Sequence, residues 1–310
     1  MCPSFRLKDF LSVGLVVLAV FGFGRSDAVA QSSFYWPKQG EPRPPRSEWY
    51  TVTKVEIANG DATLAAWVLE PRSGKPAGTV VYCHGNAGNM EHHVAFMDFL
   101  PRHGFRVLMF DYQGYGESTP NEPTRERTAS DVNAAIDFAT SRWGKPWLMG
   151  QSLGASLAIA VAGERPRDVK GVVAVAPFSS YGRVARAVLR KSLLTRPLVL
   201  PSYVIVRGGH DPIDVVADLA PTPLLLVHGE KDEIIPPRMS AELFEKAGSP
   251  KELLRVPGAG HNDGWQEMGP EYVARVVGFL TQPPPTPVAG SRPPARAEKR
   301  ASSFSKRVFR

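Results

Sequence analysis

The sequence Gly150-Gln151-Ser152-Leu153-Gly154 stands between an apolar run that begins at Trp147 and a run of small and apolar residues that continues to Gly163. The first run predicts a β-strand and the second a helix. A serine on a tight turn between them projects its hydroxyl above a sheet, and flanking glycines leave room for close passage of the backbone. Because glycine and serine are common, a loop that serves packing alone is the alternative. With its flanking strand and helix, the motif predicts Ser152 as a nucleophile.

A serine hydroxyl needs a base to accept its proton, and in this arrangement an acid and then a histidine follow the serine along the chain. Asp232 follows a predicted strand at 223–228, and His261 lies in a glycine-rich loop after a predicted strand at 252–256. This order predicts His261 as the base and Asp232 as the carboxylate that orients it. Glu230 and Glu233 are rival acids, and a plain surface turn is the alternative for Asp232.

Acyl transfer places negative charge on a carbonyl oxygen, and fixed donors must stabilise that charge. The backbone N–H of Leu153, directly after the serine, is one expected donor. The second is expected from the loop His84-Gly85-Asn86-Ala87-Gly88-Asn89, with Asn86 as the donor residue. A glycine-rich turn after a strand could instead bind a dinucleotide, but the spacing here is not G-x-G-x-x-G.

Apolar strands alternate with helical stretches through most of the chain. Strands are predicted at 79–83, 105–111, 147–150, 171–176, 223–228 and 252–256, and helices at 90–103, 128–143, 153–163, 239–247 and 267–280. Such alternation predicts an α/β fold, a mostly parallel twisted sheet with helices on both faces. Two earlier runs, 51–57 and 63–69, flank Asn59-Gly60-Asp61 and predict a hairpin. Residues 177–221 are long for a connection and predict a small cap.

Both ends of the chain differ in composition from this central part. Residues 1–30 combine two early basic residues, an apolar run at 10–23 and Ala28-Val29-Ala30, a pattern typical of a cleaved signal peptide. We therefore expect export to the periplasm or the medium, with an uncleaved N-terminal membrane anchor as the alternative. Residues 31–48 are expected to be a leader, 49–281 the catalytic domain, and 282–310 a disordered, proline-rich basic tail.

The formal net charge of +7 is concentrated in this tail. From Arg292 to Arg310 seven basic residues stand against Glu298 alone, so the tail carries +6 and the remainder about +1. No nucleic-acid partner is expected, and contact with an anionic surface is expected through the tail. Cys2 and Cys83 make no disulfide framework, and no cluster has metal-ligand spacing, so we expect neither metal nor cofactor.

Five motifs occur in order, at 84–89, 111–118, 150–154, 228–232 and 260–263. Together they resemble the α/β-hydrolase-domain family that includes the protein depalmitoylases and their serine aminopeptidase-like bacterial relatives, over about 52–280. The resemblance implies the α/β-hydrolase fold, a triad of Ser152, Asp232 and His261, and oxyanion donors at Asn86 and Leu153. It also places Tyr112 and Tyr115 near the substrate pocket. A secretion signal stands where the depalmitoylases have a cysteine-rich region.

These features predict an exported serine hydrolase that cleaves small acyl esters or thioesters through an acyl-enzyme. A serine aminopeptidase-like peptidase and a non-catalytic binding protein are the alternatives, and a competent residue at every triad and oxyanion position argues against the second. Apolar cap residues are expected to line an acyl pocket, although they could instead pack the cap onto the body: Phe178, Tyr181, Val184, Val188, Leu189, Leu193, Leu194 and Leu198.

Overall fold

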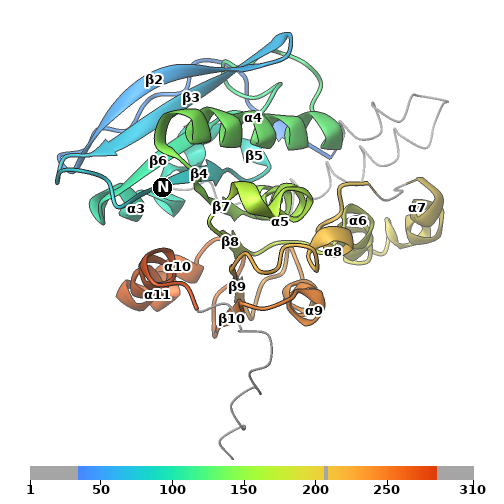
Figure 1. The fold of residues 1–310 in the computed structure, drawn as a ribbon. Helices are drawn as coiled ribbons and strands as arrows, with labels where there is room; N and C mark the ends of the chain where they lie inside the picture. The colour runs from blue at the N-terminus through green and yellow to red at the C-terminus, as the bar shows by residue number, and fades with distance from the viewer. Residues whose placement is uncertain (1–33, 206–208, 285–310) are drawn as a thin grey trace, which may run out of the picture.

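A single eight-stranded sheet forms the centre of the computed structural model, which describes residues 34–205 and 209–284 (Figure 1). The strand order is β10-β9-β8-β7-β4-β6-β3-β2. The strands are β2 (Tyr50–Asn59), β3 (Ala62–Pro71), β4 (Gly78–Cys83), β6 (Phe105–Phe110), β7 (Trp147–Gln151), β8 (Val172–Val175), β9 (Leu224–Gly229) and β10 (Lys251–Val256). The neighbouring strands in the series β6-β4-β7-β8-β9-β10 are all parallel. The pairs β2–β3 and β3–β6 are antiparallel. The predicted fold class is confirmed.

Helices cover both faces of the sheet, because alternate residues of each buried strand point to opposite sides. On β7, Leu148 belongs to one core cluster and Met149 to the other. The first cluster packs under α4 (Arg125–Trp143), α5 (Leu153–Glu164) and α9 (Arg238–Lys246). The second packs under α3 (Phe99–Arg102) and α11 (Pro270–Thr281) on the opposite face (Figure 1). This double burial explains why the strands are continuously apolar.

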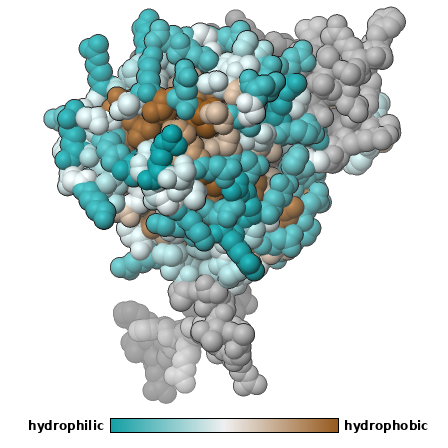
Figure 2. Space-filling view, turned by 45° about the horizontal axis from the view of Figure 1, so that its top comes forward, coloured by the Kyte–Doolittle hydropathy of each residue, from teal (hydrophilic) through white to brown (hydrophobic). Residues whose placement is uncertain are grey.

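The predicted hairpin is present, with Asn59 paired to Ala62 across a two-residue turn. Gly60 occupies that turn with φ of +62°, a conformation that glycine adopts at no steric cost. Hydrophilic side chains cover most of the face drawn in Figure 2, with hydrophobic residues gathered in limited areas between them. Within the two described ranges, no helix is both long and apolar enough to cross a bilayer.

Two predicted helices are broken in the structure. Residues 90–103 form a 3₁₀ segment, η1 (Met90–Phe96), followed by the short α3. Pro101 has no N–H for the bond that a continuous helix would require there. Residues 264–281 form α10 (Gly264–Met268) and α11, separated by Gly269 with φ of +52° and begun again at Pro270. Proline suits the first turn of a helix and not its interior.

The predicted leader, 31–48, is in part a component of the fold, which corrects the domain boundary at 49. Strand β1 (Trp36–Pro37) pairs in parallel with β5 (Ala87–Gly88). Tyr35 is only 4% exposed and joins the core cluster under α4 and α5. A two-residue strand in a proline-rich stretch leaves too short a pattern for recognition from sequence. The signal-peptide prediction for 1–30 and most of the predicted tail lie outside the described residues.

The predicted cap, 177–221, contains α6 (Tyr181–Leu189), η3 (Arg196–Leu198), α7 (Val199–Ile205) and α8 (Pro212–Val215). Its apolar residues differ in how much of their surface is exposed, and Val188 and Leu198 are half-buried. Tyr181, Val184 and Leu189 are buried against the body. Leu193 and Leu194 are instead 77% and 80% exposed, so they do not line a pocket under the cap. Tyr181, Val184 and Leu189 therefore pack the cap onto the body, which was the alternative to lining a pocket.

Near the serine motif, the backbone of α5 approaches the end of β4 so closely that no side chain fits between them. A Cβ atom on Gly154 would lie 1.9 Å from the carbonyl oxygen of Cys83 and 2.5 Å from that of His84. A Cβ atom on Gly150 would lie 2.4 Å from the backbone of Gly154. Both glycines are therefore required by backbone atoms that cannot move aside like a flexible side chain.

Gly154→Ala should lower the free energy of unfolding by about 1–3 kcal/mol or more, because overpacking here displaces backbone. Gly278→Ala is the matched control, since nothing lies within 4 Å of its Cβ position and its helix would gain up to about 1 kcal/mol. Urea unfolding of both variants measures the difference. Equal midpoints for Gly154→Ala and the wild type would contradict the packing argument.

Candidate functional site

Ser152 occupies a strained turn between β7 and α5. Its backbone has φ of 56° and ψ of −115°, a conformation that residues with a Cβ rarely adopt. The Ser152 N–H donates to the carbonyl of Val175 on the neighbouring strand β8, at 2.8 Å. The turn is thus held by the sheet, and it presents the serine hydroxyl beyond the carboxyl ends of the parallel strands.

Three side chains from the ends of three strands form an unbroken chain of hydrogen bonds. Ser152 Oγ lies 3.0 Å from Nε2 of His261, which follows β10. Nδ1 of His261 lies 2.7 Å from Oδ2 of Asp232, which follows β9. The carboxylate is fully buried, and the imidazole is 9% exposed. A hydroxyl, an imidazole and a carboxylate therefore meet in the geometry that can activate a serine.

The Asp232 carboxylate is held by four donors. Its Oδ1 accepts the backbone N–H groups of Ile234 and Ile235, each at 2.8 Å. Its Oδ2 lies 3.1 Å from Nε2 of His228, in addition to its contact with His261. Nε2 of His228 also lies 2.9 Å from the carbonyl oxygen of Ile235, which can only accept, so this nitrogen carries a proton.

The pKa of the Asp232 carboxyl is well below its ordinary value. Burial alone would raise this pKa, but hydrogen bonds and charge from His228 and His261 outweigh burial. Asp232 is consequently an anion at neutral pH, able to stabilise a positive charge on the His261 imidazole. The rival acids Glu230 and Glu233 are exposed. Sequence reasoning does not find this role of His228, because a histidine before a glycine gives no sign of its partner.

The two expected oxyanion donors follow the ends of the neighbouring strands β4 and β7. Leu153 is the first residue of α5, so its backbone N–H has no acceptor within the helix. Asn86 lies in the loop after β4, and the close approach of Gly154 to Cys83 and His84 brings this loop against the start of α5. The helix N-terminus adds partial positive charge at the same place.

The side chain of Asn86 is already engaged elsewhere. Its Nδ2 donates to the carbonyl of Phe34 at 2.7 Å, and its Oδ1 accepts from the Trp36 N–H at 3.2 Å. Asn86 therefore joins the 34–37 segment to the loop. Because its side chain is used in this way, the expected donor toward substrate is its backbone N–H.

A buried carboxylate holds both ends of this loop. Asp111 Oδ1 accepts the N–H of Met90 at 2.7 Å and lies 3.3 Å from Nε2 of His84. Gly116 makes room for this carboxylate, since a Cβ there would lie 1.9 Å from Oδ2. The conformation of residues 84–90 is therefore fixed from beneath.

Tyr112, Tyr115 and Phe178, expected to bind substrate, are all at most 1% exposed. The Tyr112 hydroxyl donates to the His84 carbonyl at 3.1 Å, and the Tyr115 hydroxyl to the Asn86 carbonyl at 2.8 Å. Phe178 packs edge to face on Tyr181 in the core. This corrects the expectation: the tyrosines support the loop from below, and proximity along the motif does not reveal which way a side chain points.

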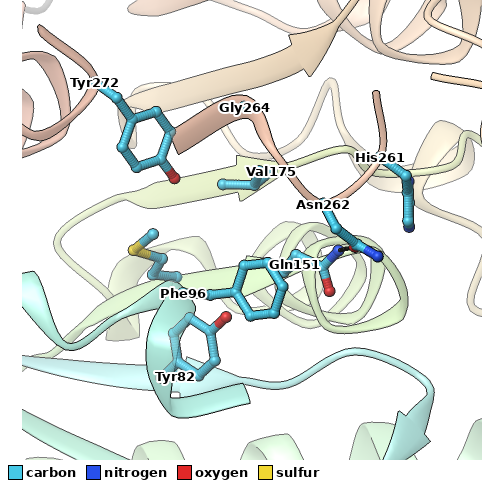
Figure 3. A pocket seen from close by; sticks show the side chains of 9 residues that line it. Tyr82, Phe96, Gln151, Val175, His261, Asn262, Gly264 and Tyr272 are labelled. Carbon is cyan, nitrogen blue, oxygen red and sulfur yellow. Dashed lines mark hydrogen bonds between the residues drawn. The ribbon is translucent and has the colours of Figure 1, made fainter. Parts of the chain in front are cut away.

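A small pocket opens beside His261 (Figure 3). Its lining residues Tyr82, Met149 and Tyr272 belong to the core cluster on the face covered by α3 and α11, and none comes from the cap. Its apolar lining comes from Phe96, Met149 and Val175 together with the rings of Tyr82 and Tyr272, and Gly264 completes the wall. Gln151 Nε2 donates to Asn262 Oδ1 at 2.9 Å across its inner side. Sequence reasoning missed this pocket, because its lining comes from six separate parts of the chain.

The chain is similar to several known proteins. Residues 74–220 match the family model described as serine aminopeptidase, S33. The uncharacterised protein YfhR of Escherichia coli strain K12 is 31% identical over 81% of this chain and 87% of its own length. Alpha/beta hydrolase domain-containing protein 17B of Xenopus tropicalis is 30% identical over 66% of each chain. The Pyrococcus furiosus esterase Pf2001 has a TM-score of 0.62 at 23% identity, over 79% of this chain and 98% of its own.

Proposed function

Because this chain belongs to the α/β-hydrolase superfamily, we propose that it is a serine hydrolase that cleaves carboxylic ester or thioester bonds through an acyl-enzyme intermediate. The observation that carries this proposal is the hydrogen-bonded chain of Ser152, His261 and Asp232. A serine on a strained turn with a base at 3.0 Å is equipped for nucleophilic attack.

In the first half-reaction, Ser152 Oγ attacks the carbonyl carbon while Nε2 of His261 takes the hydroxyl proton. The backbone N–H groups of Leu153 and Asn86 stabilise the oxyanion of the tetrahedral intermediate. Collapse breaks the bond from the carbonyl carbon to the leaving oxygen or sulfur. His261 gives its proton to that atom, and the acyl group stays on Ser152.

In the second half-reaction, a water molecule gives a proton to His261 and attacks the acyl carbon. The bond to Ser152 Oγ then breaks, His261 returns the proton to the serine, and the carboxylic acid leaves. Throughout both halves Asp232 keeps Nδ1 of His261 protonated and offsets the charge of the imidazolium. Its depressed pKa suits this role, since it stays ionised when the imidazole gains a proton.

The pocket beside His261 favours an ester over a peptide with a free amino terminus. Its lining residues include no carboxylate that could bind an α-ammonium group. Its apolar walls suit a short acyl or alkyl group. A serine aminopeptidase activity, which the matched family model suggests, is the second candidate.

Ser152→Ala should abolish labelling by a fluorophosphonate probe and lower ester turnover by about 10⁶-fold, as for other triad nucleophiles. Circular dichroism should show unchanged folding, because the hydroxyl contributes little to the core. Ser141→Ala, at an exposed serine, is the control and should label normally. Labelling that persists in Ser152→Ala would assign the nucleophile to another residue.

Asp232→Asn should lower kcat by about 10⁴-fold, because the amide favours the wrong tautomer of His261. Glu230→Gln removes an exposed carboxylate two residues away and should leave kcat unchanged. Steady-state turnover of p-nitrophenyl butyrate compares the two. Similar losses in both variants would show that Asp232 has no special role as the orienting acid.

Across p-nitrophenyl esters from acetate to palmitate, kcat/KM should rise and then fall early in the series. Each methylene that enters the pocket adds up to about 0.8 kcal/mol of binding, and longer chains exceed the small space beside His261. An aminoacyl p-nitroanilide measured in parallel should be a poor substrate. Faster cleavage of the anilide than of every ester would favour the aminopeptidase.

A further inference from the structure

Large apolar side chains are exposed mainly in one part of the described chain. Leu193, Leu194, Leu200 and Tyr203 have exposed fractions of 77%, 80%, 79% and 56%. These four residues, here termed the leucine surface, lie within the turn before η3 and on α7. Trp49, at the start of the edge strand β2, is the other large hydrophobic residue exposed to this degree in the described ranges. Gathered apolar exposure of this kind marks an interaction surface.

The leucine surface lies in a strongly basic segment. No aspartate or glutamate occurs between Asp168 and Asp211, whereas seven lysines and arginines do, five of them at 183, 186, 190, 191 and 196. Arg190 and Arg196 are exposed beside the leucines. Arg183 pairs with Glu242, and the guanidinium of Arg186 lies 4.1 Å above the ring of Tyr203. The near-neutral charge of the body as a whole conceals this local excess.

We propose that the leucine surface and its flanking arginines dock the protein on an anionic lipid bilayer. Leucines would enter the boundary of the acyl chains, and Arg190 and Arg196 would bind headgroup phosphates. Charge complementarity favours this occupant over a second copy of the chain, because a symmetric contact would set two basic segments against each other.

The basic segment follows directly from the strand that holds the catalytic serine. The carbonyl of Val175, the last residue of β8, accepts the Ser152 N–H at 2.8 Å, and α6 begins shortly afterwards at Tyr181. Docking would therefore hold the triad near the lipid surface. Resting on the proposed function, this arrangement assigns the substrate class as esters or thioesters of amphiphiles that reside in a membrane.

The test places the fluorophore NBD at position 194 in the full chain. Leu194→Cys in a Cys2→Ser background carries the label, Cys83 being buried, and Trp49→Cys labelled in the same way is the control. Vesicles of phosphatidylcholine with one third phosphatidylglycerol should raise emission at 194 several-fold and shift it to the blue. Pure phosphatidylcholine vesicles, and the label at 49, should give no such change.

Charge is tested in the same labelled protein. Arg190→Gln with Arg196→Gln should weaken partitioning onto the anionic vesicles by about thirtyfold, from about 1 kcal/mol for each basic residue at the surface. Arg72→Gln with Lys75→Gln removes two exposed basic residues outside the segment and should have little effect. Because the signal is read at position 194, binding through other parts of the chain does not contribute to it.

Three outcomes would overturn the docking proposal: no change at position 194, an equal change with neutral vesicles, or a change that depends on protein concentration without lipid and thus reports a second copy. Fluorophosphonate labelling of the same preparations separates this proposal from the proposed function. If the fluorophosphonate labels the protein but NBD emission at position 194 does not change, only the docking proposal is rejected. A fluorophore response without labelling retains docking and rejects the serine hydrolase.

Discussion

The near contact between the backbone of α5 and the end of β4 is the constraint on which the site depends. Only hydrogen at the Cα of Gly154 allows this approach, because a methyl group would overlap the Cys83 carbonyl. The approach sets the start of α5 against the loop after β4, and Ser152 lies directly before α5 with a φ of 56°. One steric requirement thus brings Ser152 and both expected oxyanion donors together. Gly150 and Gly154 contribute because they have no Cβ atom that would overlap the neighbouring backbone.

The remaining parts of the site are held by buried charge. Asp232 and Asp111 are both buried beyond the end of a strand, and each accepts a backbone N–H. Asp232 also contacts His261 at 2.7 Å, whereas Asp111 Oδ1 lies 3.3 Å from Nε2 of His84. Asp232 fixes His261, whereas Asp111 fixes the loop that contains Asn86. A buried carboxyl group is costly unless it is hydrogen-bonded, so each of these residues stabilises the arrangement that supplies its donors. The catalytic geometry is therefore coupled to the fold itself.

Sequence predicted what depends on local pattern. Strand and helix alternation gave the sheet, and the hairpin at Gly60 followed from its turn residues. Ser152, Asp232 and His261, which the order of the motifs grouped together, lie in hydrogen-bond contact. The inward direction of Tyr112 and the outward direction of Leu193 were not predictable, because side-chain direction there is set by distant elements. Strand β1 was missed since a two-residue pairing leaves no periodicity to detect.

The attachment of residues 34–37 to the loop after β4 sets a limit on N-terminal trimming. Asn86 is hydrogen-bonded to Phe34 and Trp36, and β5, which begins directly after Asn86, pairs with β1. A protease that removed the chain up to residue 48, the boundary that composition suggests, would cut away partners of the loop that carries Asn86. Any N-terminal cleavage would have to fall before Phe34 for that loop to keep these hydrogen bonds. Composition alone would put the safe cutting point some fifteen residues too far into the chain.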